Sequence, residues 1–241
     1  MNKSILRLQV NKPPKTCIFC GSQDRVTHDH VPPKNIFPPP RPSNLITVPS
    51  CKTCNSSDSK DEEYFRLKIC MSENVGTNTD ASKNRETIFR SMTRPDAKGL
   101  KRAFIKDIET VQLKTPSGIY LPEQRWAFHV DLERIFRVVK KSVKGLYYHE
   151  TGYRFNDQAY GIDVHSDETL IENPAEMLEE LKTTILLPLS LQPPKIIGNG
   201  VFSYRHYITI EDPYVSVWAL AFYDQVPFLA ITGPLASKTT S

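Results

Sequence analysis

The sequence has no apolar run that approaches the length of a membrane-spanning helix. Its first residues also lack the apolar core of a signal peptide, because Arg7 interrupts the short apolar stretch. Apolar residues make up 39% of the chain and charged residues 24%, a balance typical of soluble globular proteins. We therefore expect a cytoplasmic protein with no membrane partner. A length of 241 residues suffices for one large domain or two small ones.

Internal repeats, low-complexity tails and the GxGxxG and P-loop motifs are likewise missing. Nothing therefore supports a repeat architecture or nucleotide binding through those loops.

Cysteine is scarce, with only five residues in the chain. Four of them form two Cys-x-x-Cys pairs, Cys17 with Cys20 and Cys51 with Cys54. In a reducing compartment this spacing favours metal binding over disulfide bonds. The fifth, Cys70, lies in a helical pattern, and we interpret it as a small buried apolar side chain.

The two cysteine pairs predict a structural zinc site. Zinc prefers four ligands in a tetrahedron, and the Cys-x-x-Cys spacing lets both sulfurs of a pair reach one ion. A gap of 30 residues separates Cys20 from Cys51, so a segment with its own structure is held between the pairs. Because this segment is short and rich in proline, bound zinc would supply folding free energy that apolar burial could hardly provide.

The net charge of +4 is unevenly distributed. Residues 1–60 contain nine Lys and Arg against three Asp, whereas residues 61–241 contain 22 Lys and Arg against 24 Asp and Glu. Positive charge around the cysteine pairs suits a polyanionic partner such as nucleic acid. A solvated lysine-rich surface accounts for the charge equally well.

Residue patterns predict an α+β protein. Two strands, at residues 25–31 and 45–48, flank a proline-rich loop, and a helix begins just after Cys51. Further helices are predicted at residues 61–73, 81–93, 95–107, 131–148 and 167–182. Further strands are predicted within 108–130 and at 154–164, 201–210, 214–223 and 227–232, the last three as an antiparallel meander.

The predicted helix at residues 131–148 is strongly amphipathic. Its apolar stripe consists of Leu132, Ile135, Val139, Val143 and Leu146. A second stripe is basic and consists of Arg134, Arg137, Lys141 and Lys144. The basic stripe could lie along a phosphate backbone, or it could be an ordinary solvated face.

Four short motifs follow one another in residues 15–65. They read Cys-x-x-Cys from Cys17, Asp-His-Val-x-Pro from Asp29, Asn-Leu-Ile-x-Val-Pro from Asn44, and Cys-x-x-Cys-Asn from Cys51. In this order they resemble the HNH endonucleases, and in particular the variant whose ββα-metal core is clamped by a Cys₄ zinc. The resemblance ends near residue 65.

The resemblance implies roles for individual residues. Asp29 and Asn55 would be the protein ligands of a catalytic Mg²⁺ or Mn²⁺, and His30 would be the general base. Asn44 would brace the loop that carries the base. It stands seven residues before Cys51, where many members have five, and Asn35 is the alternative for this role.

The implied chemistry agrees with the residue types. A carboxylate and an amide oxygen are hard ligands that suit Mg²⁺ or Mn²⁺. Such an ion can polarise the scissile phosphate and stabilise the leaving 3′ oxygen, while a neutral imidazole can deprotonate water near pH 7. By resemblance the products would carry a 5′-phosphate and a 3′-hydroxyl.

Strand alternation alone cannot identify the base, because it puts His28 and His30 on one face and Asp29 on the other. The resemblance selects His30. His28, Lys34 and Lys60 flank the site, and each is either a phosphate contact or an exposed side chain.

The sequence thus predicts three segments: a Cys₄-zinc HNH nuclease module at 1–60, a helical connector at 61–107, and a C-terminal mixed α/β domain with antiparallel strands at 108–241. The last would serve specificity, dimerisation or regulation. The main hypothesis is a DNA endonuclease, of a kind that at family level resembles mobile-element or antiviral defence nucleases. The alternatives are a zinc-stapled nucleic-acid-binding module without catalysis and an RNA-directed effector nuclease. A regulatory protein partner or a homodimer is expected to restrain cleavage.

Overall fold

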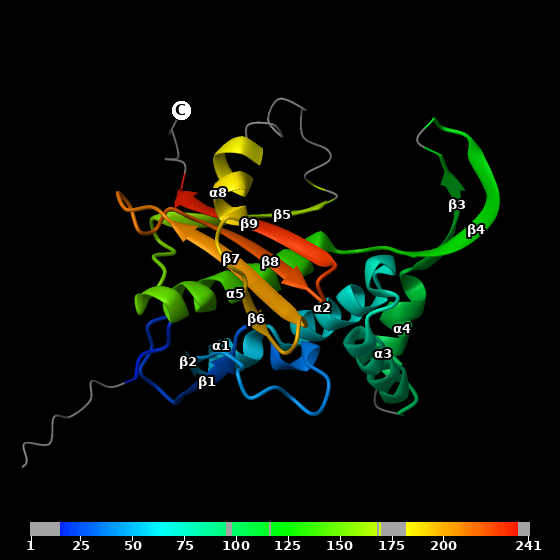
Figure 1. The fold of residues 1–241 in the computed structure, drawn as a ribbon. Helices are drawn as coiled ribbons and strands as arrows, with labels where there is room; N and C mark the ends of the chain where they lie inside the picture. The colour runs from blue at the N-terminus through cyan, green and yellow to red at the C-terminus, as the bar shows by residue number, and fades with distance from the viewer. Residues whose placement is uncertain (1–14, 95–97, 116, 168, 170–181, 236–241) are drawn as a thin grey trace, which may run out of the picture.

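A computed structural model describes residues 15–94, 98–115, 117–167, 169 and 182–235 (Figure 1). The segment predicted as a helix at 167–182 lies largely outside these residues. The described chain is mixed α+β with antiparallel sheets, which confirms the predicted α+β class and the predicted antiparallel strands. Among the described residues, no helix combines the length and apolar content needed to cross a bilayer.

A β-hairpin followed by a helix forms the N-terminal part. Strand β1 (Val26–His30) pairs antiparallel with β2 (Thr47–Cys51), with Val26 opposite Cys51 and His30 opposite Thr47. The proline-rich loop between the strands contains the short 3₁₀ helix η1 (Lys34–Ile36). Helix α1 (Lys52–Ser57) begins directly after β2, as the sequence predicted.

Three longer helices come next. They are α2 (Ser59–Met71), α3 (Thr79–Met92) and α4 (Lys98–Lys106), with the 3₁₀ helix η2 (Glu73–Val75) between the first two. The side chain of Asn78 caps α3 by accepting hydrogen bonds from the backbone N–H groups of Asp80 and Ala81.

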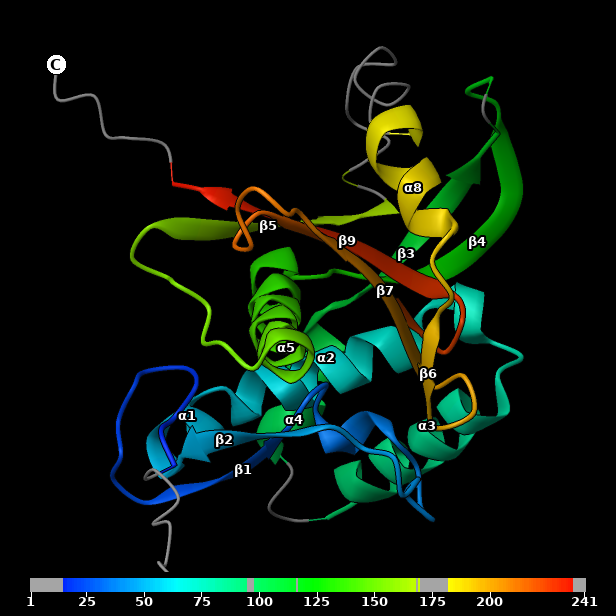
Figure 2. The ribbon, with the colours of Figure 1, turned by 60° about the vertical axis from the view of Figure 1, so that its left-hand side comes forward.

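Strands β3 (Ile108–Lys114) and β4 (Tyr120–Phe128) form a separate two-stranded sheet. Figures 1 and 2 show this hairpin, which we call the arm, extending away from the rest of the fold. Most of its side chains are exposed, unlike those of the other sheets.

Helix α5 (Leu132–Thr151) is the predicted amphipathic helix. The side chain of Asp131 caps its start, and Gly152 ends it with a φ of 76° that favours glycine. Its predicted apolar stripe is buried except for the half-buried Leu132.

The C-terminal part is an antiparallel sheet of five strands in the order β5-β9-β8-β7-β6. The strands are β5 (Tyr160–Ser166), β6 (Lys195–Ile197), β7 (Phe202–Ile208), β8 (Ser216–Phe222) and β9 (Val226–Pro234). The π-helical turn η4 (Lys182–Leu186) and the short helix α8 (Leu187–Ser190) precede β6.

Helices α2 and α5 lie between the β1–β2 hairpin and the five-stranded sheet (Figure 2). At one point the approach is very close, because a Cβ on Gly145 of α5 would lie 2.4 Å from a methyl carbon of Val31. The buried side chains of all three predicted segments belong to one core cluster, which includes Ile36, Phe65 and Phe222. The segments at 1–60, 61–107 and 108–241 therefore share a hydrophobic core.

Candidate metal centre and its surroundings

Four cysteines from a turn, a strand and a helix converge on one place. Cys17 and Cys20 lie in the turn before β1, Cys51 ends β2, and Cys54 lies in α1. Their sulfur atoms all lie within 4.8 Å of one another, and those of Cys20 and Cys51 are 3.7 Å apart. Sulfurs at about 2.3 Å from one zinc ion in a tetrahedron stand about 3.8 Å apart, so the four thiols fit a zinc ion.

Backbone hydrogen bonds shape this cluster. Gly21 follows the first cysteine pair with a φ of 80°, and its N–H donates to the carbonyl of Cys17 at 2.9 Å. The N–H of Ile18 donates to the carbonyl of Pro49, which ties this turn to β2. The Cys51 sulfur accepts a hydrogen bond from the N–H of Cys54 and so caps α1.

Arg154, from the connection between α5 and β5, holds the first cysteine turn in place. Its guanidinium donates to the carbonyls of Ile18 at 3.1 Å and Phe19 at 3.2 Å. A Cβ at Gly21 would lie 2.7 Å from this guanidinium, so a side chain there would disturb the contact. No local motif marks Arg154, so its role could not be predicted from the sequence.

The thiols of the cluster are not equivalent. Burial acts to raise the pKa of Cys17, but hydrogen bonds from the N–H groups of Cys51, Cys20 and Phe19 outweigh it and lower that pKa to about 6. Burial and the neighbouring sulfurs raise the pKa of Cys54.

Cys70 lies outside the cluster, as predicted. It is fully buried in α2, and its sulfur contacts the Tyr223 hydroxyl at 3.3 Å. Burial raises the pKa of Cys70 to about 11, which suits an unreactive structural thiol.

The two histidines of β1 have different surroundings. His28 is exposed, and its Nε2 lies 3.2 Å from the ammonium of Lys15. His30 is half buried at the end of the strand. Burial, together with the nearby charges of Lys34 and Arg41, lowers the pKa of His30 against the opposing effect of Asp29. A lowered pKa favours the neutral imidazole near pH 7.

Asn55 reaches from α1 back to β1. Its side-chain amide donates to the carbonyl of His28 at 3.1 Å and to the Thr27 hydroxyl at 3.3 Å. Side chains alternate along a strand, so Thr27 and Asp29 share a face. Asn55 therefore lies on the face of β1 that carries Asp29.

Asp29 is buried, with only 7% of its surface exposed. Its Oδ1 accepts a hydrogen bond from the N–H of His30 at 2.9 Å. Its Oδ2 lies 3.0 Å from the Lys141 ammonium of α5, although this ion pair lacks the geometry of a hydrogen bond. The second oxygen of Asp29 thus has a positive neighbour but no hydrogen-bond donor among the described residues.

Lys141 is shared among three carboxylates. Besides Asp29, its ammonium lies 3.0 Å from Glu62 and 3.6 Å from Asp58. Burial would lower the pKa of Lys141, but Asp29 and Glu62 raise it above the ordinary value. Burial and the charges of Asp29 and Asp58 raise the pKa of Glu62, against the effect of Lys141. We call Asp29, Asp58, Glu62 and Lys141 the acidic cluster.

Asn44 and Asn35 occupy different places. The side-chain amide of Asn44 donates to the carbonyl of Ile196, so this hydrogen bond braces the proline-rich loop against β6 and not the segment that carries His30. Asn35 lies in η1, five residues after His30, and its amide donates to the carbonyl of Glu62. Asn35 therefore ties the segment after His30 to α2.

The basic stripe of α5 is paired with carboxylates. Arg134 and Arg137 both donate to Asp61, at 2.7 and 2.8 Å. Lys141 belongs to the acidic cluster, and Lys144 pairs with Asp157. The stripe does form one face of the helix, but its charges are balanced within the protein. The side chains of Lys34 and Lys60 are exposed, as the sequence analysis allowed.

A hollow of about 280 Å³ opens between α1 and α5 beside the cysteines. It is lined by Phe19, Cys54, Ser57, Asp58, Arg137, Lys140, Lys141 and Lys144. Lys141 of the acidic cluster therefore borders an open space.

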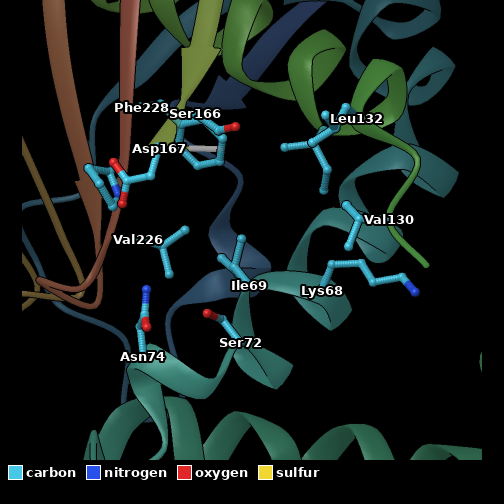
Figure 3. Close-up of a pocket in the computed structure, with 12 residues that line it drawn as sticks. Lys68, Ile69, Ser72, Asn74, Val130, Leu132, Ser166, Asp167, Val226 and Phe228 are labelled. Carbon is cyan, nitrogen blue, oxygen red and sulfur yellow. The ribbon is translucent and has the colours of Figure 1, made fainter. Parts of the chain in front are cut away.

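A second hollow, shown in Figure 3, lies between α2, the start of α5 and the β8–β9 turn. Its walls are largely apolar, with Ile69, Val226 and Phe228 among them. The Lys68 ammonium points away from this hollow and binds Asp107 at 2.9 Å and the carbonyl of His129 at 2.7 Å. This hollow has no part in the cysteine site.

The described residues thus bring the four cysteines to one centre and bring Asn55 to the Asp29 face of β1. The Asn44 side chain contacts β6 instead, and Asp29 has a lysine partner that no local motif could have revealed.

Comparison with protein-family models, curated proteins and solved structures finds no match to this chain.

Proposed function

We propose that this protein is a metal-dependent endonuclease that hydrolyses phosphodiester bonds in DNA. In this proposal Cys17, Cys20, Cys51 and Cys54 hold a structural zinc ion, and Asp29 and Asn55 hold Mg²⁺ or Mn²⁺. His30 acts as the general base.

One observation carries the proposal: helix α1 starts directly after Cys51 of the cluster and returns the Asn55 amide to the His28 carbonyl of β1, one residue before Asp29. The carboxylate, the imidazole and the amide therefore belong to one short strand and the helix beside it. This is the hairpin–helix order that the resemblance to HNH endonucleases implies.

Asp29 supports an ion at this place. A buried carboxylate oxygen without a hydrogen-bond donor favours a cation beside it, and at present the Lys141 ammonium supplies that charge. A divalent ion would offer the same oxygen a direct bond. Bound there, Mg²⁺ or Mn²⁺ would stabilise negative charge on the scissile phosphate and the leaving oxygen.

The protein's own residues have separate tasks. The N–H of His30 fixes the orientation of the Asp29 carboxylate through its hydrogen bond to Oδ1. The His30 imidazole, neutral near pH 7, takes a proton from the attacking water. Asn35 holds the segment after His30 against α2 and so limits its movement.

The second candidate is a zinc-stapled nucleic-acid-binding module without catalysis. The ion pair between Asp29 and Lys141 favours it, because a carboxylate already neutralised by an ammonium needs no metal ion. On this alternative Asp29 is a structural residue that joins β1 to α5, and His30 has no chemical role.

Nicking of supercoiled plasmid with Mg²⁺ or Mn²⁺ separates the two candidates. We expect wild type to nick DNA and His30→Ala to lose at least about 100-fold in rate, as is usual for a lost general base. The matched control is His28→Ala, on the same strand and face, which should stay within about fivefold of wild type. If wild type and His30→Ala bind DNA but are equally inert, the binding module is correct.

A further inference from the structure

A group of exposed cations lies on the helical pair α3–α4, away from the α5 stripe that the sequence highlighted. Residues 79–107 contain eight Lys and Arg against four Asp and Glu. Five of these cations have exposed side chains that form no ion pair or hydrogen bond with any residue the structure describes: Arg90, Arg94, Lys101, Arg102 and Lys106. We call these five the α3–α4 cations.

Three of the four carboxylates of this segment lie among the described residues, and none of the three pairs with the five cations. Asp80 pairs with Lys83, and Asp107 pairs with Lys68. Glu86, one turn before Arg90 in α3, is exposed. On α5, by contrast, every member of the basic stripe has a carboxylate partner.

The packing of α4 directs its basic face outward. The Phe104 ring contacts Phe89 of α3 at 6.1 Å and Phe128 of β4 at 5.1 Å between centroids. Phe104 thereby anchors α4 between α3 and the base of the arm. Lys101, Arg102, Ile105 and Lys106 line the open side of the helix together.

The arm extends this surface with a neutral, partly aromatic face. Side chains alternate along β4, so Trp126 shares the face of Phe128, which contacts α4. Gln124 and, on β3, Gln112 lie on the same face, since Gln112 pairs with Gln124 in register. Trp126 is 75% exposed, an unusual position for so large an apolar ring.

We propose that the α3–α4 cations and this face of the arm form the surface on which DNA binds. The cations contact backbone phosphates, and Trp126 with the two glutamines contacts bases or sugars. Cations that have no ion-pair partner among the described residues, beside an exposed aromatic ring and amide groups, match the chemistry of a nucleic acid. A nucleic acid presents phosphates outside and base edges and faces within. The inference rests on the proposed action on DNA and assigns the substrate surface to a part of the chain outside the hairpin.

Fluorescence anisotropy with a labelled duplex, without added divalent ion so that no cleavage occurs, tests the proposal. The double variant Lys101→Glu with Arg102→Glu should weaken binding at least tenfold. The matched comparison, Lys34→Glu with Lys60→Glu, makes the same change of charge at the hairpin and should weaken binding less than threefold. Wild-type affinity in the first variant, or an equal loss in both, overturns the proposal.

Two further readouts are specific to the contacts. If Lys101 and Arg102 both contact phosphates, their replacement by Gln should reduce the slope of log affinity against log salt by about 2. Trp218 is fully buried, so fluorescence quenching on DNA binding should come from Trp126 and vanish in Trp126→Phe. An unchanged salt slope or quenching that persists in Trp126→Phe contradicts the assigned contacts.

The experiment separates this proposal from the nuclease proposal. Binding that depends on the α3–α4 cations without cleavage by wild type would contradict the nuclease alone. Cleavage by wild type that Lys101→Glu with Arg102→Glu leaves unchanged at sub-saturating DNA would contradict the surface alone. Single-stranded DNA and RNA probes of equal length then show which nucleic acid the surface prefers.

Discussion

Two groups of side chains, the cysteine cluster and the acidic cluster, lie near the β1–β2 hairpin. They differ in what stands next to their negative charge. The four thiols of the cysteine cluster have one another and backbone N–H groups as their described polar neighbours. The carboxylates of the acidic cluster surround the Lys141 ammonium. A metal ion is therefore expected to stabilise the cysteine cluster outright, whereas at Asp29 it must compete with a lysine.

Removing one sulfur of the cysteine cluster should have the largest effect on stability. Cys51→Ser should lose bound zinc and lower the free energy of opening of β1, β2 and α1 by more than about 4 kcal/mol, since structural zinc supplies about 10–16 kcal/mol in small zinc domains. Hydrogen exchange with metal analysis would show lost protection in these elements and retained protection in β8. Cys70→Ala is the matched control and should keep zinc. This prediction is wrong if Cys51→Ser keeps its full zinc content, or if β8 loses as much protection from hydrogen exchange as the hairpin does.

Removing the ammonium should have the next largest effect. Lys141→Met leaves Asp29 buried without a counter-charge and should cost about 3 kcal/mol of unfolding free energy, measured with denaturant. Mn²⁺ should then raise the stability of the variant more than that of wild type, because the ion takes over the lost charge.

Arg137→Met is the control for this variant, because its ion pair with Asp61 is half exposed and should contribute less than about 1 kcal/mol. Wild-type stability of Lys141→Met, together with no difference in the response to Mn²⁺, would show that the acidic cluster does not depend on its lysine.

Disturbing the close contact between α5 and the hairpin should lower the unfolding free energy by an intermediate amount. Gly145→Ala would put a methyl group 2.4 Å from Val31 and should cost about 1–3 kcal/mol through overpacking. Val31→Ala, added to Gly145→Ala, should recover part of this loss, which a double-mutant cycle in denaturant would measure. Simple additivity of the two changes would mean that positions 145 and 31 are not energetically coupled, which contradicts the overpacking explanation.

The smallest expected effect is the contribution of Asp61, which lies outside the acidic cluster, to the pH dependence of stability. Burial would raise the pKa of Asp61, but Arg137 and Arg134 lower it below the ordinary 3.8. Because the folded-state pKa is the lower one, Asp61 stabilises the fold above pH 3.8, and this contribution is lost as the pH falls through the folded value. Asp61→Asn should lose this acid dependence, by less than about 1 kcal/mol. If the unfolding free energy of Asp61→Asn falls at acid pH as much as that of wild type, Asp61 makes no such contribution.

Much of the fold could be predicted because its signals are local. The apolar stripe of α5, the strand alternation around Asp29 and the spacing of the cysteine pairs each depend on neighbours within a few residues. Those patterns correctly predicted the helix, the strand β1 and the convergence of the sulfurs.

What sequence patterns missed depends on contacts distant in the chain. Nothing near Lys141 indicates that it meets Asp29, and nothing near Arg154 indicates that it holds the first cysteine turn. The same cause makes the α5 stripe a misleading signal, since Asp61 and Asp157 supply its counter-charges from other elements. The α3–α4 cations have no regular spacing, and their exposure appears only in the folded chain.

Anomalous scattering from crystals grown with Mn²⁺ would locate both proposed metal ions. We expect a zinc peak among the four sulfurs and a separate manganese peak beside Asp29 and Asn55, with the Lys141 ammonium displaced from Asp29. Sulfurs without zinc would contradict the structural site. Lys141 still paired with Asp29 at saturating Mn²⁺ would contradict the catalytic one.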